Sequence, residues 1–381
     1  MKYFLLIISI CLFILPLNVR GEVLIDGAVS GILIDADSGK VIYKKNIDEK
    51  VAVASMTKMV GQILIMEEIE KGNISWDDII TVSKNAADMG GSQIYIEQGE
   101  KISIRDLMKG ISMASGNDAT VQMAEVISGT ESKFVKRMND KVKELGLKNT
   151  KFINSTGLDE EGHYSSAYDI AMIARELVTK HPGILEFSSV YEDYLRENTD
   201  NKFWLVNTNK LVHFYDGADG LKTGHTDAAG YCLAATAKRG GLRLIAVVLG
   251  EVDAKTRNSE AMELLDYGFN TVKLNKLKGK GEVLKEVKIN KGNVDKVNLV
   301  LKDDLSVIEE SGSGKRKYEF KYDIKEIKLP IKKNTCIGKV RVYYKDEFVT
   351  SRDLCVDRDV DKLSLFELYY SEFIKLVCGD Y

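Results

Sequence analysis

The sequence has few of the residues that build metal and redox sites. Its four histidines, at positions 163, 181, 213 and 225, form no H-E-x-x-H motif or comparable spacing. Its five cysteines include no C-x-x-C pair, and Cys11 lies in the apolar N-terminal run. We therefore expect neither a metal site nor a cofactor, and we interpret His163, His181 and His213 as structural.

The other four cysteines are too few for a disulfide framework in a chain of 381 residues. Pairing of Cys336 with Cys355 is the alternative in an export compartment. We favour free or buried thiols for the set, which consists of Cys232, Cys336, Cys355 and Cys378.

A strong excess of either charge is also missing. The chain has 54 Lys and Arg against 57 Asp and Glu, a formal net charge of -3, and no basic patch stands out in its first 270 residues. Such a composition does not favour binding to a phosphate backbone. We therefore expect no nucleic-acid partner.

Long apolar runs are missing too, apart from one at the N-terminus. It extends from Tyr3 to Leu17, with one serine inside it, and is shorter than the roughly 20 residues of a membrane-spanning helix. One lysine precedes it, and the small residues Val19 and Gly21 follow. These features predict a secretory signal peptide over residues 1–21, with an uncleaved N-terminal anchor as the alternative. In both cases the folded part works outside the cytoplasm.

The next part of the chain mixes strand and helix patterns. Residues 31–43 contain two β-type runs around an Asp-Ser-Gly turn, and a second hairpin pattern follows position 220 around an Arg-Gly-Gly turn. Helical patterns dominate between the two, and a helix over residues 259–269 closes this part. Strands at both ends with helices between them predict one α+β domain over residues 22–271, whose terminal segments meet in a sheet.

The last part of the chain predicts a small separate domain and a helix. Apolar and polar residues alternate from about Val272, which indicates an antiparallel β domain over residues 272–361. Residues 362–381 predict a helix with a narrow polar stripe and a broad apolar face. Such a helix either lies in a membrane surface or docks onto the β domain, and both interpretations stay open. Its acidic residues would not draw it to anionic lipids.

A serine and a lysine stand at the start of the most apolar helical pattern. The stretch "ASMTKMVGQI", from Ala54, begins a predicted helix of about four turns that ends near Glu70. Apolar residues cover most of its surface, so we expect it to be buried. Positions three apart share a helix face, which brings the Ser55 hydroxyl within hydrogen-bond reach of the Lys58 amine. A serine N-cap followed by a solvated lysine is the alternative.

Two further short motifs change the interpretation of this pair. "SGN", from Ser115 to Asn117, lies in a predicted turn between two helices, and "KTGHT", from Lys222 to Thr226, leads into the second hairpin. Alone, the first suits a turn and helix cap, and the second suits a strand-to-turn glycine. In the order S-x-x-K, S-x-N and K-T-G, they match an active-site set of penicillin-binding proteins and class A β-lactamases.

The chain resembles the low-molecular-weight penicillin-binding proteins that act as serine-type D-alanyl-D-alanine carboxypeptidases. The resemblance is strong over about residues 29–269 and rests on architecture alone beyond them. It implies an antiparallel sheet flanked by helices, a helical subdomain, and then the β domain and tail helix. Besides the motifs, the segments that resemble the family are "GGSQIYIEQGEKISIRDLM", "NSTGLDEEGHYSSAYDIA", "NTNKLV" and "DGLKTGHTDAAGYCLAATAKRGGLRLIAVVLG".

The resemblance also implies a catalytic group. Ser55 would attack the substrate carbonyl, and Lys58 would take its proton, which requires a neutral amine. Burial and the nearby charge of Lys222 would both lower the pKa of Lys58 toward that state. Ser115 would relay a proton to the departing D-alanine nitrogen, and Asn117 would bind the peptide backbone of the substrate.

The remaining residues that the resemblance implies bind oxygen atoms of the substrate. The backbone N–H groups of Ser55 and His225 would form the oxyanion hole. Lys222, Thr223 and Gly224 would line the substrate site. Thr223 and Arg257 would meet the terminal carboxylate, which suits the planar guanidinium of arginine.

The implied reaction removes the terminal D-alanine from a peptidoglycan stem peptide through an acyl-enzyme on Ser55. β-Lactams would acylate the same serine and leave slowly, and the protein would work at the extracytoplasmic face of a bacterial membrane or in the cell wall. A D,D-endopeptidase would use the same residues. A class A β-lactamase fits less well, because Gly116 stands where it carries Asp and no E-x-x-L-N segment is present. A non-catalytic wall-binding protein is also disfavoured, since all five catalytic candidates are present.

Overall fold

The computed structural model of the protein describes residues 24–197, 199–314 and 316–378. The predicted signal peptide, residues 1–21, lies outside the described residues. Five antiparallel strands form the central sheet in the order β2-β1-β9-β8-β7. Because β1 pairs with β9, the two ends of the first domain do meet in one sheet, and the predicted α+β class is confirmed. The strands are β1 (Ser30–Asp35), β2 (Val41–Lys45), β7 (Ala218–Thr226), β8 (Gly230–Arg239) and β9 (Leu242–Glu251).

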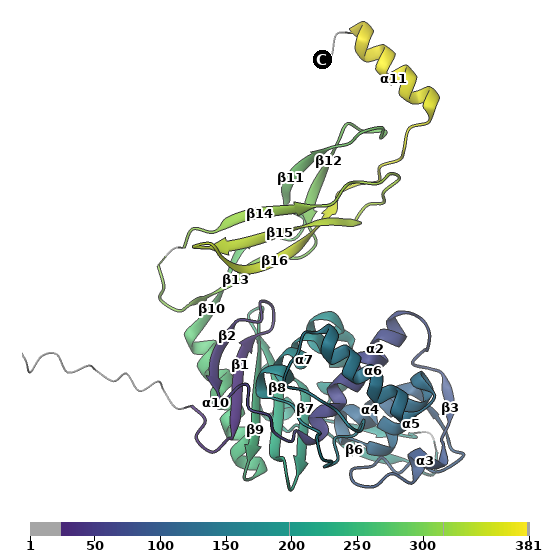
Figure 1. The fold of residues 1–381 in the computed structure, drawn as a ribbon, viewed down its shortest axis with the longest axis vertical. Coiled ribbons are helices and arrows are strands. Elements are labelled where there is room, and N and C mark those ends of the chain that lie inside the picture. The colour runs from purple at the N-terminus through teal and green to yellow at the C-terminus, as the bar shows by residue number, and fades with distance from the viewer. Residues whose placement is uncertain (1–23, 198, 315, 379–381) are drawn as a thin grey trace, which may run out of the picture.

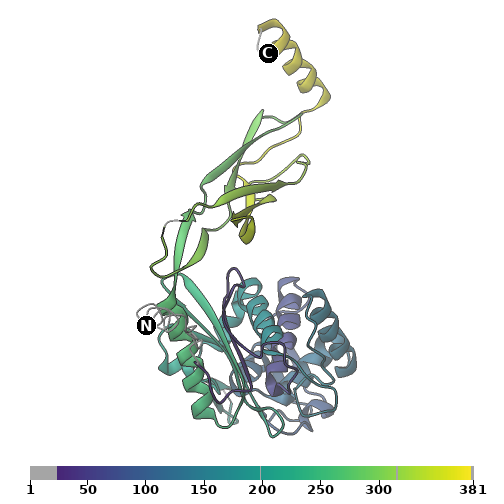
Figure 2. The ribbon, with the colours of Figure 1, turned by 60° about the vertical axis from the view of Figure 1, so that its left-hand side comes forward.

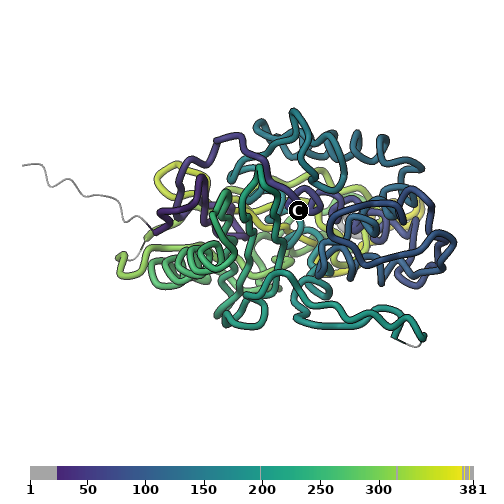
Figure 3. The backbone as a smooth tube through the Cα atoms, turned by 90° about the horizontal axis from the view of Figure 1, so that it is seen from below, coloured from purple at the N-terminus to yellow at the C-terminus, as the bar shows by residue number. Residues whose placement is uncertain are grey.

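Helices cover both faces of this sheet (Figure 1, Figure 2). Successive side chains of a strand point to opposite faces. Along β9, Ile245 and Val247 therefore enter a core shared with the helical region, while Leu244 and Ala246 enter a second core under α10. Seen from below, the helices between residues 58 and 144 lie on the side of the domain away from α10 (Figure 3). The principal helices are α2 (Lys58–Glu70), α4 (Ile104–Lys109), α5 (Asn117–Ser128), α6 (Glu131–Glu144), α7 (Ala167–Lys180) and α10 (Ala254–Thr271).

The helical part also contains elements that the sequence patterns did not predict. Two small two-stranded sheets, β3-β4 and β5-β6, stand beside the helices, and a π-helical turn, η2, joins α4 to the S-G-N turn. The closing helix α10 begins five residues earlier than expected, because Asp253 caps it by accepting from Lys255 N and Thr256 N. The additional elements are η1 (Ala54–Thr57), β3 (Ile79–Thr81), α3 (Lys84–Ala87), β4 (Lys101–Ser103), η2 (Gly110–Ala114), η3 (Pro182–Ile184), α8 (Leu185–Ser188), β5 (Glu192–Leu195), β6 (Phe203–Val206) and α9 (Leu211–Phe214).

A second domain of strands follows α10 directly and has its own apolar core. It contains a two-stranded sheet, β10-β13, and a five-stranded sheet in the order β11-β12-β16-β15-β14. Val272 and Ile308 from the smaller sheet join the core under α10, and an Arg352–Asp37 ion pair also connects the domains. The strands are β10 (Val272–Lys278), β11 (Val283–Lys288), β12 (Lys296–Leu301), β13 (Leu305–Glu310), β14 (Glu319–Ile324), β15 (Cys336–Tyr344) and β16 (Glu347–Val356).

The preference for free thiols was wrong for one pair of cysteines. Cys336 and Cys355 form a disulfide. The physical reason is register, because the two residues face each other across β15 and β16, a relation that no cysteine spacing reveals. Cys232 remains a free, buried thiol.

The chain continues into a single helix, α11 (Leu365–Cys378), at the far end of the β domain (Figure 1, Figure 2). Its large apolar side chains are exposed: Leu365 by 88%, and Phe366 and Tyr369 each by 82%. In the part of the chain that the structure describes, no helix has the length and apolar character needed to cross a membrane.

Candidate active site

The serine and lysine of the S-x-x-K motif lie at the junction of two helical segments. Ser55 belongs to the 3-10 turn η1, and Lys58 is the first residue of α2. The distance from Lys58 Nζ to Ser55 Oγ is 2.7 Å. No side chain caps η1 or α2, and Lys58 is fully buried. The alternative of a serine cap with a solvated lysine is therefore wrong, and the predicted contact between the two side chains is present.

The surroundings of Lys58 favour a neutral amine. Burial holds the pKa of Lys58 well below its usual value, the charge of Lys222 lowers it further, and Asp118 partly opposes both effects. The amine also donates a 2.6 Å hydrogen bond to the carbonyl oxygen of Thr156. Lys58 Nζ is thus fixed between a backbone carbonyl and the Ser55 hydroxyl.

Two glycines allow other segments to approach the serine backbone closely. A Cβ atom on Gly157 would lie 1.9 Å from Ala54 O, and one on Gly224 would lie 2.8 Å from Val53 O and 3.2 Å from Ser55 N. Ala54 itself has φ of +47°, an uncommon conformation for alanine. The loop around Gly157 and the K-T-G strand β7 therefore enclose the nucleophile from two sides.

The S-G-N turn follows the π-helical turn η2. Ser115 adopts a left-handed conformation, with φ of +64°, and strained residues of this kind concentrate at functional sites. Its hydroxyl oxygen is buried, and none of the described residues hydrogen-bonds to it. Asn117 Nδ2 donates to Gly90 O over 2.7 Å. Asp118 accepts from the backbone N–H of Ile94 at 3.0 Å, so this turn and the loop after Gly90 support each other.

The K-T-G strand carries a buried cationic group. Burial lowers the pKa of Lys222 to about 7, and the charge of Arg257 contributes. Arg257 is 5% exposed and donates to Asn258 Oδ1 at 2.8 Å, and within the described ranges it pairs with no carboxylate. The Thr223 hydroxyl donates to Thr208 Oγ1 over 2.8 Å. These groups leave a buried positive region without a counter-ion from the described residues, which suits an anionic ligand.

His225 lies two residues beyond the K-T-G threonine, and its side chain is exposed. Its ring packs 4.0 Å from the ring of Tyr231. Strand β7 is the last strand of the sheet, so one side of its backbone has no neighbouring strand in that sheet. This edge position is compatible with the predicted use of the His225 backbone N–H.

The structure therefore brings most of the predicted residues together. Ser55, Lys58 and Gly224 are in direct contact, and Lys222 and Arg257 act electrostatically on their neighbours. Among the described residues, no hydrogen bond joins Ser115 or Asn117 to that group. Their turn is linked to it by the effect of Asp118 on Lys58, and by Thr208, which bonds to both Met113 O and the Thr223 hydroxyl.

Sequence reasoning missed several supporting groups. These are the Thr156 carbonyl, Gly157, Asp118 and the Thr208 hydroxyl. The segment "NSTGLDEEGHY" contains Thr156 and Gly157 and contributes to the family resemblance. Nothing in its composition indicates that a backbone oxygen binds the lysine.

Comparison with known proteins identifies the class to which this fold and site belong. A family model described as D-alanyl-D-alanine carboxypeptidase, Peptidase_S11, matches residues 25–253, and the C-terminal domain model of penicillin-binding protein 5 matches residues 273–362. The chain belongs to this family of D-alanyl-D-alanine carboxypeptidases.

Individual relatives cover nearly the whole chain. It is 45% identical to D-alanyl-D-alanine carboxypeptidase DacF of Bacillus subtilis, over 93% of this chain and 90% of the relative, and 34% identical to DacA of Escherichia coli, over 92% and 87%. Among solved structures, it resembles PBP3 of Streptococcus pneumoniae, at 27% identity and a TM-score of 0.72, over 88% of this chain and 99% of the other. Penicillin-binding protein D2 of Listeria monocytogenes, in its ampicillin-bound form, matches at 32% identity and a TM-score of 0.58, over 64% and 98%.

Proposed function

We propose that the protein is a serine-type D-alanyl-D-alanine carboxypeptidase that trims peptidoglycan stem peptides. The observation that carries this proposal is the buried Lys58 amine, whose Nζ lies 2.7 Å from Ser55 Oγ, beside a second buried lysine. A base of this kind activates a hydroxyl nucleophile. Relatives that match nearly the full chain are named for this activity.

Acylation begins when Ser55 Oγ attacks the carbonyl carbon of the penultimate D-alanine. The neutral Lys58 amine takes the hydroxyl proton, and its bond to Thr156 O keeps it aligned during the transfer. The carbonyl oxygen becomes negative and is stabilised by the backbone N–H groups of Ser55 and His225. The C–N bond then breaks, the proton reaches the departing nitrogen by way of Ser115, and the terminal D-alanine leaves.

The positive region near Lys222 selects a substrate with a free terminal carboxylate. Among the described residues, the Arg257 guanidinium hydrogen-bonds to one group, the neutral amide oxygen of Asn258. The Thr223 hydroxyl lies on β7, next to Lys222. A carboxylate would supply the missing negative charge. Water then hydrolyses the ester on Ser55, and the shortened peptide is released.

β-Lactams are the expected covalent inhibitors of the same serine. The support is that a family relative, penicillin-binding protein D2 of Listeria monocytogenes, has been solved in ampicillin-bound and cefotaxime-bound forms. A β-lactam presents both an acylating carbonyl and a carboxylate, so it meets the same groups as the peptide.

Two measurements test this function. The protein should label with a fluorescent penicillin and release D-alanine from a pentapeptide, and Ser55→Ala should lose both activities while the surface control Ser189→Ala keeps them. Undiminished labelling of Ser55→Ala would refute the acyl-enzyme. Cleavage of a cross-linked muropeptide without release of D-alanine from the pentapeptide would indicate an endopeptidase instead.

We also propose export and contact with a membrane surface. The N-terminal sequence has the composition of a signal peptide. At the other end of the chain, α11 exposes Leu365, Phe366, Tyr369 and Tyr370 to solvent. An exposed apolar helix face of this kind suits the boundary between lipid headgroups and acyl chains. Such contact would hold the enzyme at the extracytoplasmic face of the membrane, next to its substrate.

A further inference from the structure

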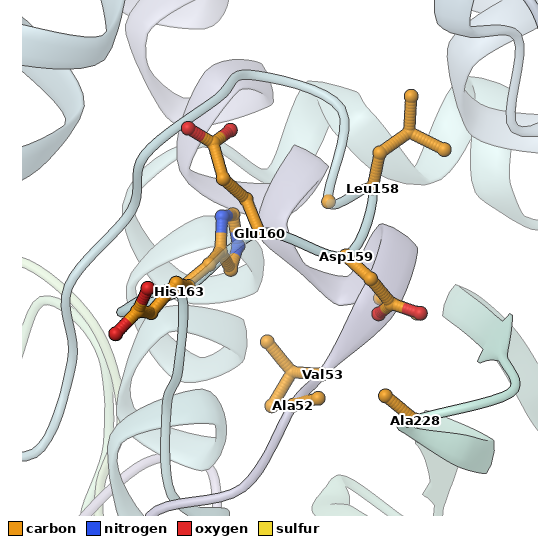
Figure 4. Close-up of a pocket in the computed structure, with 10 residues that line it drawn as sticks. Ala52, Val53, Leu158, Asp159, Glu160, His163 and Ala228 are labelled. Carbon is orange, nitrogen blue, oxygen red and sulfur yellow. The ribbon is translucent and has the colours of Figure 1, made fainter.

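His163 connects the loop that binds Lys58 to the helical turn that carries Ser55 and Lys58. This loop leaves the core at residue 151 and returns at residue 164, where the two ends pair. Thr156 lies within it and accepts from Lys58 Nζ. His163 stands on the returning arm and is 8% exposed. Its ring lies beside a cavity of about 350 Å³ that also borders Ala54 and Gly157 (Figure 4).

Both ring nitrogens of His163 are engaged. Nδ1 accepts a hydrogen bond from the backbone N–H of Ile153, on the outgoing arm of the loop, over 3.2 Å. Nε2 lies 2.8 Å from the hydroxyl oxygen of Thr57. Because Nδ1 is an acceptor, a neutral ring carries its hydrogen on Nε2 and donates it to Thr57. Burial lowers the pKa of His163 to about 4, which keeps the ring neutral at ordinary pH.

Thr57 is fully buried and occupies the third position of the S-x-T-K sequence. It is separated from Ser55 by one residue and is adjacent to Lys58. Any movement of the loop relative to Thr57 would therefore change the position of the Thr156 carbonyl relative to the Lys58 amine. The imidazole connects the outgoing arm, the returning arm and the catalytic turn with two hydrogen bonds.

We infer that His163 is a positioning residue for acylation. It fixes the 153–157 segment relative to Thr57, and this placement aligns Lys58 Nζ between Thr156 O and Ser55 Oγ. It does not touch substrate. The inference rests on the proposed role of Lys58 as the base that activates Ser55. An error of about 1 Å in the placement of a catalytic group can reduce a rate on the order of 100-fold. We therefore expect the two hydrogen bonds of His163 to affect the acylation rate.

Substitutions can separate the two hydrogen bonds. Gln at position 163 offers an N–H near the place of Nε2, and Asn offers an oxygen near the place of Nδ1. His163→Gln therefore keeps the contact with Thr57, and His163→Asn keeps the contact with Ile153. Thr57→Val removes the partner hydroxyl at nearly constant volume and leaves the histidine in place. His213→Ala is a matched control, since that ring stacks on Tyr191 outside this loop.

The experiment measures the acylation rate constant k2 and the binding constant K for a fluorescent penicillin, from the concentration dependence of labelling, in the mature full-length chain. We expect His163→Ala and Thr57→Val to lower k2 by about tenfold or more and to leave K within about twofold. His163→Gln and His163→Asn each break one of the two hydrogen bonds of His163, so both should also lower k2, and His213→Ala should behave like the wild type. Unchanged k2 in folded His163→Ala, or wild-type k2 in either the Gln or the Asn variant, would overturn the inference.

Two further results keep this test separate from that of the function. If the wild type labels and Ser55→Ala does not, while Thr57→Val has wild-type k2, the function stands and the role of His163 fails. A nitrogen NMR spectrum of labelled His163 should show protonated Nε2 and unprotonated Nδ1 at pH 7. The opposite tautomer would contradict the hydrogen-bond assignment on which this connection depends. His163→Ala that does not fold leaves Thr57→Val as the deciding variant.

Discussion

At the scale of single residues, the electrostatic effect of Lys222 on Lys58 gives a testable pH dependence. Burial is the main cause of the low pKa of Lys58, and the charge of Lys222 is the second. Lys222→Met removes that charge while filling the same space, so the pKa of Lys58 should rise. Less of the amine is then neutral at a given pH. The acid limb of the acylation rate should therefore move upward, by about one pH unit, since a like charge nearby is worth that much.

The measurement is the rate of penicillin labelling between pH 5 and 10. Lys222→Met should also label more slowly at every pH, because Lys222 is a predicted contact of the substrate, and so the midpoint of the acid limb is the diagnostic quantity. Arg257→Met is the matched control, since Arg257 affects Lys222 and not Lys58 directly. An acid limb at the wild-type pH in Lys222→Met would show that burial alone sets the pKa of Lys58.

The sequence identifies the residues with side-chain chemistry better than those that act through the backbone. Ser55, Lys58 and Lys222 lie in short motifs whose residue types are required by the reaction. The contact of the Thr156 carbonyl with Lys58 and the close approach of Gly157 to Ala54 depend on the path of a loop. Because every residue type has a backbone carbonyl, the sequence does not indicate which one binds the lysine. His163 was interpreted as structural because the histidines show no metal-binding spacing, and its contact with Thr57, 106 residues away, is not visible in the sequence.

At the scale of elements, a pair of buried carboxyl groups connects the end of β9 to helix α10. Glu251 is 1% exposed and Glu260 is 7% exposed. Glu251 Oε1 and Glu260 Oε2 are buried and meet no donor among the described residues. Glu260 Oε1 accepts from the backbone N–H groups of Asp26 and Gly27, which attaches the segment before β1. Burial, with the neighbouring Glu260 carboxyl, raises the pKa of Glu251 to about 7. Glu251 is therefore protonated below that pH.

This pair should make the stability of the first domain depend on pH. The pKa of Glu251 is raised in the folded state, so its contribution is fully present below the unfolded value of about 4.5 and is lost as pH rises to about 7. Glu251→Gln keeps a hydrogen-bond donor without a titrating proton. At pH 8 it should be more stable than the wild type by about 1 to 3 kcal/mol, and at pH 4.5 the difference should be small or reversed.

Urea unfolding followed by tryptophan fluorescence measures this difference. Both tryptophans, Trp76 and Trp204, lie in the first domain, so the signal reports that domain alone. Glu263→Gln, an exposed change on the same helix, should leave the pH profile unaltered. Equal pH dependence of Glu251→Gln and the wild type would exclude a raised pKa of Glu251.

The order of elements was predictable where the residue pattern is strong. The hairpin over residues 31–43, the buried helix after Ser55 and the strands around Gly240 have clear periodicity and turn residues, and all are present. The π-helical turn before Ser115 and the hairpin β5-β6 were not predicted. Both depend on tertiary contacts, such as the bond from Thr208 N to Met113 O, rather than on local preference.

At the scale of the whole molecule, the first domain, which holds the candidate active site, and the tail helix lie at opposite ends of the long axis (Figure 1). The β domain lies between them and is joined to the first domain through Val272, Ile308 and the Arg352–Asp37 pair. If α11 lies in the membrane surface, the β domain sets the distance from the membrane at which the first domain meets the cell wall.

Binding of the mature chain to lipid vesicles tests this arrangement. Flotation with phosphatidylcholine vesicles should recover the protein, and added salt or anionic lipid should change little, because α11 has no excess of positive charge. A double substitution, Leu365→Ser with Phe366→Ser, removes two exposed apolar side chains, each worth about 2 kcal/mol when buried. It should lower binding by about 100-fold or more and leave penicillin labelling unchanged, whereas Phe214→Ser, an exposed change on the first domain, should alter neither. Vesicle binding that survives the double substitution, or that depends on anionic lipid, would show that α11 is not the membrane contact.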